Sequence, residues 1–279
     1  MISRREALKQ LATMATLPVA MPLAASAASA DKLDRIGLAL FTVRPLVARD
    51  FDRTLQQIAE IGYRDLDMYI YEAHRRPKET RAALDRAGLS CTSARVAGAA
   101  LYRGWDRSLD AALTLGARWI TLANLAYEER LALIDYQELA DVFNRVGGAA
   151  KERGLRFAYH SHDFELEPMD GRVPLDLLLS STDPDLVKLQ MDVYWMAHGG
   201  RDPIAMLRQL GARVASVHLK DMDRNRDITT VGAGTIDFAP ILAAARRAGV
   251  RDFYVEEDAP RDPLVAIVSA YRHLASLTF

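Results

Sequence analysis

The stretch GLRFAYH, residues 154–160, decides the fold class because it joins the end of a helix to a buried strand. Glycine tolerates the left-handed conformation in which many helices end. The short apolar run that follows Gly154 is typical of a buried strand. The segment before it, residues 135–153, is predicted to be the longest helix of the chain.

The same unit of helix, glycine and apolar run recurs along the chain. Two further apolar runs, residues 36–41 and 187–191, lack the glycine, which brings the number of predicted strands to eight. Helical segments over residues 51–61 and 238–248 each place apolar side chains on one face. The other glycines of the unit are Gly62, Gly88, Gly116, Gly211 and Gly249.

Eight alternating strands and helices predict a (β/α)8 TIM barrel, an α/β fold, as a single domain over residues 31–279. About 31 residues per unit agree with the roughly 250 residues of such barrels. An open doubly wound sheet would show a glycine-rich phosphate turn after the first strand. Residues 42–50 contain no glycine, which favours the barrel.

Residues 1–30 are predicted to be an export signal. Arg4 and Arg5 precede an apolar run over residues 11–25, and small residues at 28–30 offer a cleavage site. The paired arginines resemble a twin-arginine signal, although Ala7 stands where phenylalanine is usual, so the general secretory route stays open. We expect a periplasmic protein without a stable membrane anchor after processing.

The composition excludes several classes of protein. Formal net charge is -1, from 36 Lys+Arg and 37 Asp+Glu, and 50% of residues are hydrophobic. A disordered or collagen-like chain would differ strongly from these values. A nucleic-acid partner is not expected, because the chain has no basic excess. The single cysteine, Cys91, allows no intramolecular disulfide.

Polar residues end four consecutive predicted strands: His160, Asp192, His218 and Glu256. Active-site groups of a barrel project from these carboxyl ends. Two imidazoles and two carboxylates suit Mn²⁺, Co²⁺, Zn²⁺ or Fe²⁺ better than the all-oxygen site of Ca²⁺. We therefore expect a divalent metal with these four ligands, on condition that the barrel forms.

Five motifs carry a family resemblance over the second half of the chain. The chain resembles the xylose isomerase-like sugar phosphate isomerase/epimerase superfamily, whose barrels commonly bind one divalent metal with residues from strands 5 to 8. The resemblance implies the same four ligands, with His160 in place of the usual glutamate. The motifs are YHSHDFE (159–165), DVYW (192–195), VHLKDM (217–222), VGAGTIDF (231–238) and YVEED (254–258).

The resemblance implies a metal-dependent isomerase or epimerase that abstracts a proton next to a carbonyl of a sugar or keto-sugar, and the predicted signal implies that this enzyme is exported. Glu256 is the expected base, with His160 or His162 on the opposite side and Lys220 as proton donor to a substrate oxygen. The expected substrate-binding residues are Trp195, Arg95 and Arg226, and Tyr69 and Tyr71 could stack on a sugar ring.

Two alternatives stay open. The same enediolate would eliminate a group from the β-carbon, which makes a lyase or dehydratase acting on a keto-sugar or keto-inositol. Replacement of the strand-5 glutamate by His160 also allows a non-catalytic sugar-binding barrel. A phosphodiester endonuclease is disfavoured, because six histidines are few for its metals. The expected partner is a small carbohydrate, and the sequence leaves homo-oligomer formation open.

Overall fold

A computed structural model describes residues 31–71 and 75–279. The predicted export signal, residues 1–30, lies outside the described residues. Among the described helices, none is both long enough and apolar enough to span a membrane.

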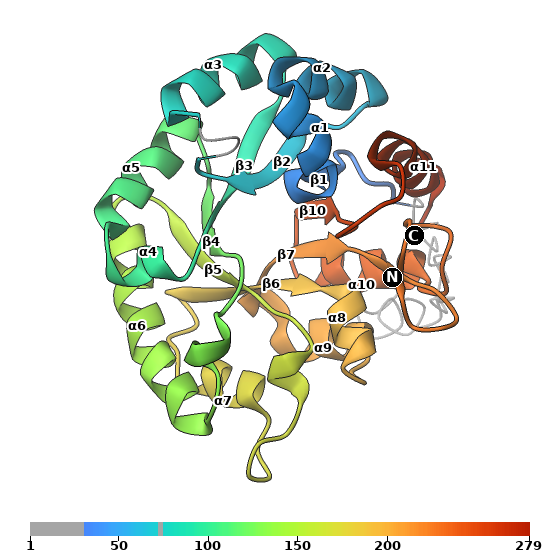
Figure 1. The fold of residues 1–279 in the computed structure, drawn as a ribbon. Helices are drawn as coiled ribbons and strands as arrows, with labels where there is room; N and C mark the ends of the chain where they lie inside the picture. Colours follow the sequence, from blue (N-terminus) through green and yellow to red (C-terminus); the bar gives the residue numbers. More distant parts are fainter. Residues whose placement is uncertain (1–30, 72–74) are drawn as a thin grey trace, which may run out of the picture. The chain divides into compact units, whose positions relative to one another are not determined.

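Eight parallel strands close into a barrel in the order β1-β10-β7-β6-β5-β4-β3-β2 (Figure 1). The predicted TIM barrel is confirmed. The first strand is shorter than the predicted 36–41, because the chain turns into a 3-10 helix over Leu40–Val43. The strands are β1 (Gly37–Ala39), β2 (Asp65–Tyr69), β3 (Ser90–Val96), β4 (Trp119–Leu122), β5 (Arg156–His160), β6 (Val187–Asp192), β7 (Val214–Leu219) and β10 (Asp252–Val255). A separate hairpin joins β8 (Asp221–Met222) to β9 (Ile228–Thr229).

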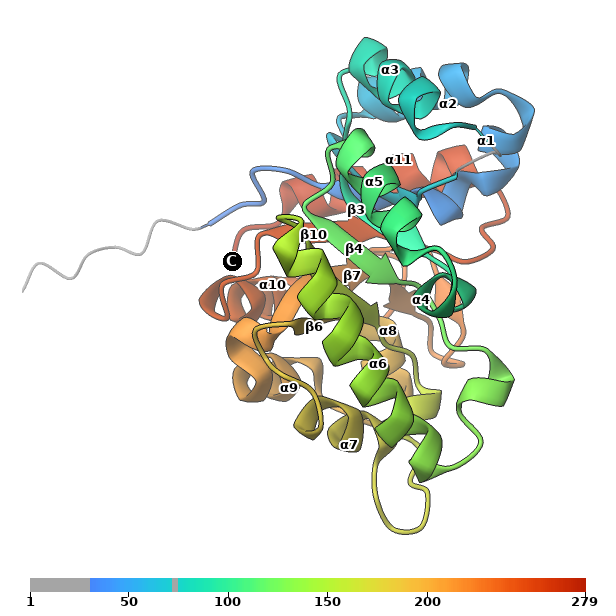
Figure 2. The ribbon, with the colours of Figure 1, turned by 90° about the vertical axis from the view of Figure 1, so that its left-hand side faces the viewer.

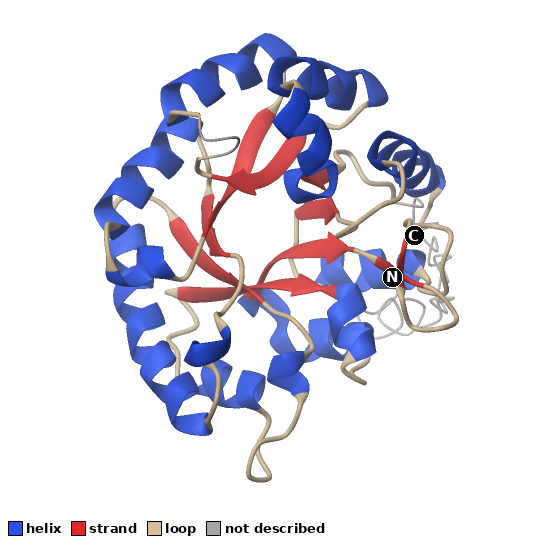
Figure 3. Cartoon of the chain, in the orientation of Figure 1, coloured by secondary structure: helices blue, strands red, loops and turns tan. Residues whose placement is uncertain are grey.

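A ring of helices surrounds the strands (Figure 3). The predicted helix over 51–61 is confirmed at both ends, and the predicted helices over 135–153 and 238–248 differ from α6 and α10 by one or two residues at their ends. The helices are α1 (Arg44–Arg49), α2 (Phe51–Ile61), α3 (Pro77–Ala87), α4 (Ala99–Tyr102), α5 (Trp105–Leu115), α6 (Leu133–Glu152), α7 (Pro174–Ser180), α8 (Val193–His198), α9 (Pro203–Leu210), α10 (Phe238–Arg247) and α11 (Pro263–Ser276).

Local sequence explains where several helices begin and end. Asp202 and Asp262 accept backbone N–H groups of the first turns of α9 and α11, and a proline follows each of them. This combination satisfies donors that a helix start leaves free. At the other end, Gly88 and Gly116 close α3 and α5 with φ of 68° and 77°. These two positions favour glycine because other side chains are strained there.

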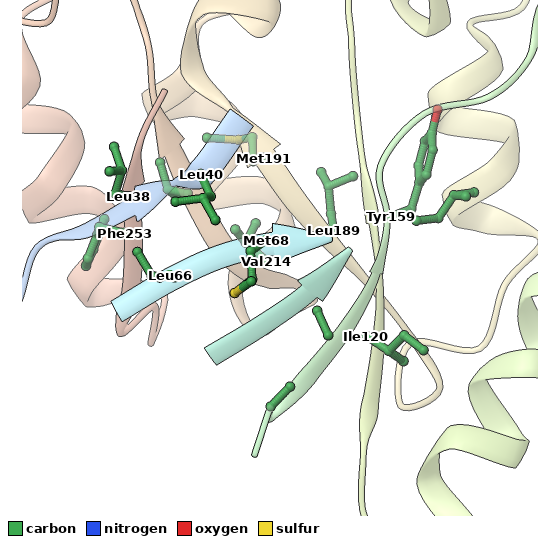
Figure 4. Packing of buried hydrophobic residues seen from close by; sticks show 14 of the residues in the cluster. Leu38, Leu40, Leu66, Met68, Ile120, Tyr159, Leu189, Met191, Val214 and Phe253 are labelled. Atoms are coloured by element: carbon green, nitrogen blue, oxygen red, sulfur yellow. The ribbon is translucent and has the colours of Figure 1, made fainter. Parts of the chain in front are cut away.

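The apolar core lies between the barrel strands and the helices. Leu66 and Met68 of β2 and Leu189 and Met191 of β6 belong to one buried cluster (Figure 4). Strand side chains alternate between two faces, so the residues between these ones point into the barrel. Figure 2 turns the barrel by 90° and shows α6 running along its outside.

The inward positions are unusually polar for a barrel interior, which branched apolar side chains normally fill. Gln190 Nε2 donates to Ser216 Oγ at 3.1 Å, and Ser93 Oγ lies 3.0 Å from Thr121 Oγ1. Buried polar groups are costly unless they are hydrogen-bonded, so this interior must be a connected network. Its buried members include Asp67, Ser93, Arg95, Thr121, His160, Gln190, Asp192, Ser216, His218 and Glu256.

Two adjacent glycines of α6 offer a sharp test of its packing. A Cβ on Gly147 would lie 2.5 Å from the Leu186 carbonyl oxygen, whereas a Cβ on Gly148 would meet nothing within 4 Å. We expect Gly147→Ala to lower the free energy of unfolding. Gly148→Ala should raise it by up to about 1 kcal/mol, because alanine favours helix. Urea unfolding of both variants checks this, and equal effects would contradict the packing of α6.

Candidate active site

The carboxyl ends of the strands surround a cavity of about 200 Å³. The sequence-predicted residues Arg95, His160, His162, Lys220 and Glu256 all line it. The other lining residues are Phe41, Tyr69, Ala123, Asn124 and Asp258.

The four predicted metal ligands come together at this cavity, which two of them, His160 and Glu256, line. His160, Asp192, His218 and Glu256 are buried, and each offers one ligand atom within 4.8 Å of the others. They come from β5, β6, β7 and the residue after β10, as the barrel arrangement requires. Asp192 also caps α8, since its Oδ1 accepts the N–H of Tyr194 at 2.9 Å.

Glu256 is surrounded by three cationic side chains. Arg95 Nη1 donates to its Oε1 at 2.9 Å, while His218 Nδ1 and Lys220 Nζ lie 3.0 and 3.1 Å from its Oε2. Burial raises the pKa of Glu256, but Lys220, His218 and Arg95 outweigh burial and hold it well below its usual range. Glu256 is therefore a stable carboxylate with both oxygens engaged.

Lys220 faces three carboxylates although it is almost fully buried. Its Nζ lies 2.7 Å from Asp258 Oδ1, 3.2 Å from Asp192 Oδ2 and 3.1 Å from Glu256 Oε2. Burial lowers the pKa of this ammonium, but the charges of Asp192, Glu256 and Asp258 outweigh burial and raise it above its usual range. Lys220 therefore remains a cation at the floor of the cavity.

His218 lies between two carboxylates. Its Nε2 is 2.9 Å from Asp67 Oδ2, and its Nδ1 is 3.0 Å from Glu256 Oε2. Burial lowers the pKa of His218, yet the charge of Glu256 and the contacts with Asp67 outweigh this and raise it to about 9. The imidazolium is thus the favoured form without a metal.

His160 has a fixed orientation. Its Nδ1 lies 3.0 Å from Gln190 Oε1, and Gln190 in turn donates to Ser216. Gln190 therefore favours the tautomer with hydrogen on Nδ1, which leaves Nε2 as a lone pair. Burial, His218 and Arg95 lower the pKa of His160 well below its usual value, so the ring is neutral.

His162 reaches the cavity from the loop after β5. Its ring stacks on the ring of Phe164, with 5.3 Å between the two centroids. The Arg130 guanidinium lies 3.6 Å from the centroid of the Phe164 ring. Burial and Lys220 lower the pKa of His162 to about 3, so it is neutral. Its Nδ1 is buried and has no hydrogen-bond partner among the described residues.

A buried carboxyl holds this loop. Glu165 accepts the His162 backbone N–H at 2.9 Å and a hydrogen bond from the Tyr159 hydroxyl. Burial raises the pKa of Glu165 to about 8. Glu165 itself lies outside the residues that line the cavity.

The VGAGTIDF motif has a structural explanation. Asp221 Oδ2 accepts the N–H groups of Gly232 and Gly234, and its Oδ1 accepts those of Met222 and Ile236. A Cβ on Gly234 would lie 2.3 Å from Asp221 Oδ1. The buried carboxylate therefore requires a close backbone approach, and it fixes the loop after β9.

The structure does not bring two predicted substrate-binding residues to the cavity lining. Arg226 is exposed in the turn between β8 and β9, where its backbone adopts φ of 72°, and its guanidinium donates to the His198 carbonyl instead. Trp195 is not among the lining residues, and Lys220 Nζ lies 5.1 Å from its ring centroid. Its Nε1 is buried without a hydrogen-bond partner among the described residues.

Sequence analysis assigned no role to Asp67, Gln190 or Asp258. Asp67 contacts His218, Gln190 orients His160, and Asp258 pairs with Lys220. Asp67 and Gln190 occupy inward strand positions, and Asp258 ends the YVEED motif. Alternation along a strand could have indicated the first two, whereas the partner of Lys220 depends on how the chain turns after β10.

The donor set of the cluster is suitable for a divalent metal. Asp192 Oδ2 faces Lys220 Nζ at 3.2 Å and His218 Nε2 faces Asp67 Oδ2 at 2.9 Å, while the Gln190 contact leaves Nε2 of His160 available. A ligating histidine usually has its other nitrogen held in this way. Lys220 lies close to two of the carboxylates and would share them with the ion.

Comparison with known proteins places the chain in a family. Residues 55–277 match the pattern of the xylose isomerase-like TIM barrel, and the chain belongs to this family. An inosose dehydratase of Geobacillus kaustophilus is 26% identical over 267 residues, which cover 80% of this chain and 84% of that protein. Several other inosose dehydratases match over about half of their own length.

Solved structures with low sequence identity share the fold. A sugar phosphate isomerase/epimerase from Parabacteroides distasonis has a TM-score of 0.78 at 23% identity, over 90% of this chain and 98% of that one. A structure of IOLI protein with a bound zinc atom has a TM-score of 0.67 at 16% identity, over 88% and 99%. A barrel of this fold can therefore hold a metal ion.

Asp192→Asn tests the metal ligands while retaining the cap of α8, because the amide oxygen can still accept the Tyr194 N–H. Loss of an outer-shell partner typically weakens metal binding about 10–100-fold, so loss of a ligand should cost at least about 100-fold. Zinc titration calorimetry measures this. His198→Gln is the control, because His198 pairs with Asp163 at the rim. Unchanged zinc affinity in Asp192→Asn would reject the site.

Glu165 should make stability depend on pH. The raised pKa means that the folded chain binds a proton more tightly than the unfolded chain between about pH 4.5 and pH 8. The free energy of unfolding should therefore fall as pH rises through this window, by up to about 1.4 kcal/mol per unit. Glu165→Gln cannot titrate and should lose this contribution. Urea unfolding of both proteins at several pH values measures this contribution. The same dependence of the free energy of unfolding on pH in both proteins would contradict the prediction.

Proposed function

We propose that the protein is a metal-dependent lyase that dehydrates a keto-sugar or keto-inositol. The observation that carries the proposal is the cavity lining, which includes both the Lys220 side chain and the neutral His162 ring. Dehydration next to a carbonyl needs both features: a cation that stabilises the enediolate and a group that accepts the α-proton.

His162 is the proposed proton carrier. It accepts the proton from the carbon next to the carbonyl, and the electron pair of the broken C–H bond forms the enediolate. The enediolate then expels a hydroxyl group from the β-carbon, and the proton on His162 leaves with that hydroxyl as water. Stacking on Phe164 keeps the imidazole oriented for both transfers.

Lys220 and Glu256 have different proposed roles. Lys220 stabilises negative charge that develops on the substrate oxygen, since it remains protonated. Both oxygens of Glu256 are engaged by cations, so we assign it the role of holding Arg95, His218 and Lys220 in place. Because the neutral His162 ring lines the cavity, we assign proton abstraction to His162 in place of Glu256, the base expected from sequence.

A divalent cation, proposed to be Zn²⁺, Mn²⁺, Co²⁺ or Fe²⁺, would be held by His160, Asp192, His218 and Glu256. When bound, it supplies Lewis-acid stabilisation to the carbonyl oxygen. Binding requires His218 to lose its proton, so metal affinity should rise with pH.

Support for dehydration over isomerisation comes from the relatives. The chain matches inosose dehydratases over much of its length. An isomerase or epimerase would share the proton abstraction and differ only in where the proton returns. A keto-inositol carries a hydroxyl group on the β-carbon, and loss of this group makes the reaction an elimination.

Product analysis of the zinc-loaded protein tests the proposal. We incubate it in D₂O with a keto-inositol and with 3-keto sugars, and follow products by mass spectrometry. A dehydratase should give a product 18 Da lighter, the mass of water. Deuterium in an otherwise unchanged sugar would indicate an isomerase or epimerase instead, and binding without either reaction would favour the non-catalytic barrel.

Glu256→Gln should lower activity by at least about 100-fold, because Glu256 is a proposed metal ligand and loss of an outer-shell partner alone costs about 10–100-fold. It should also destabilise the fold, because removal of one partner of a buried ion pair costs about 3–5 kcal/mol. Glu257→Gln is the matched control: Glu257 is half-buried and accepts a hydrogen bond from Thr230 Oγ1 at 2.9 Å, which an amide oxygen can also accept. Initial rates and thermal melts decide, and loss of activity in the Glu257 variant alone would contradict the assignment.

We further propose export to the periplasm, supported by the basic and apolar pattern of residues 1–30. Mass spectrometry of protein from the cell envelope should find a chain that begins near Asp31. A mature protein that still begins at Met1 would refute cleavage.

A further inference from the structure

A second, larger cavity adjoins the candidate active site. It has a volume of about 630 Å³, and it shares Tyr69 and Arg95 with the catalytic cavity. The catalytic cavity alone, at about 200 Å³, is smaller than the about 300–1,000 Å³ that is usual for ligand sites. Tyr69 and Arg95 thus border both spaces, which makes the larger cavity a candidate extension of the catalytic one.

The wall of the larger cavity is formed by small and apolar residues. Ala97, Ala99 and Ala100 lie in the turn after β3 and in α4, and they leave the space open. Tyr71 also lines this cavity, with 51% of its surface exposed. Small side chains beside an exposed aromatic ring suit a flat apolar group.

Two exposed arginines give this cavity positive charge. Arg103 and Arg107 line it, are exposed, and form no ion pair with any residue in 31–71 or 75–279. Arg107 packs over Gly104, where a Cβ would lie 3.0 Å from its Nη2. In contrast, the nearby Arg76 pairs with Glu79 at 3.1 Å. Planar guanidinium groups suit the two-point binding of a carboxylate.

We infer that this larger cavity, a groove beside the catalytic cavity, binds a second part of the substrate: a flat apolar substituent with a carboxylate, attached to the sugar ring in the catalytic cavity. The ring would lie between Lys220 and His162, the substituent beside Tyr71, and the carboxylate at Arg103 and Arg107. The inference rests on the proposed function, because it takes the ring to be the reacting part.

Binding of non-reacting glycosides tests the groove separately from catalysis. Calorimetry with the zinc-loaded protein compares para-carboxyphenyl β-glucoside with phenyl β-glucoside. We expect the carboxylate to improve affinity about tenfold, the value of one charge-assisted contact. The double variant Arg103→Gln/Arg107→Gln should lose this gain and bind the phenyl glucoside as before.

Arg208→Gln is the matched control, because Arg208 is an exposed arginine of α9 and lines neither cavity. It should leave both affinities unchanged. No binding of the carboxyphenyl probe, equal affinity of the two probes, or an equal loss in Arg208→Gln would overturn the inference. Dehydration of a simple keto-inositol together with equal probe affinities would reject the groove and retain the proposed function. Different affinities for the two probes without dehydration of the keto-inositol would retain the groove and reject the proposed function.

Discussion

The balance of charge around Glu256 is the constraint on which the site depends. One buried carboxylate meets a guanidinium, an imidazole and an ammonium within about 3 Å. Each of these charges would be costly in the barrel interior alone, and each is stabilised by the others. Three further carboxylates complete the network: His218 pairs with Asp67, and Lys220 pairs with Asp192 and Asp258.

This network replaces the apolar filling of a typical barrel, so stability has to come from elsewhere. The described core lies between strands and helices, where residues such as Leu66, Met68 and Met191 are fully buried. Close approaches such as Gly147 against Leu186 bring the helices near the strands. The interior is thereby free to hold charges and hydrogen bonds that position functional groups.

The site residues come both from the rigid strands and from the loops that follow them. His160, Asp192, His218 and Glu256 stand on strands or directly after them, which suits ligands that must converge on one point. His162 comes from a loop, yet Glu165 and Phe164 hold it in place. Tyr69 and Arg95 border both the catalytic cavity and the larger cavity next to it.

The sequence by itself determined the barrel, because a glycine-ended helix followed by an apolar run is a local pattern that recurs along the chain. It also determined the four candidate ligands, since equal positions at strand ends meet in any barrel of this kind. Only the tertiary structure decided which charges face one another: that Glu256 is held ionised by three cations, that Gln190 orients His160, and that Arg226 points to the rim. These outcomes depend on distances between distant segments and on burial, neither of which any local pattern encodes.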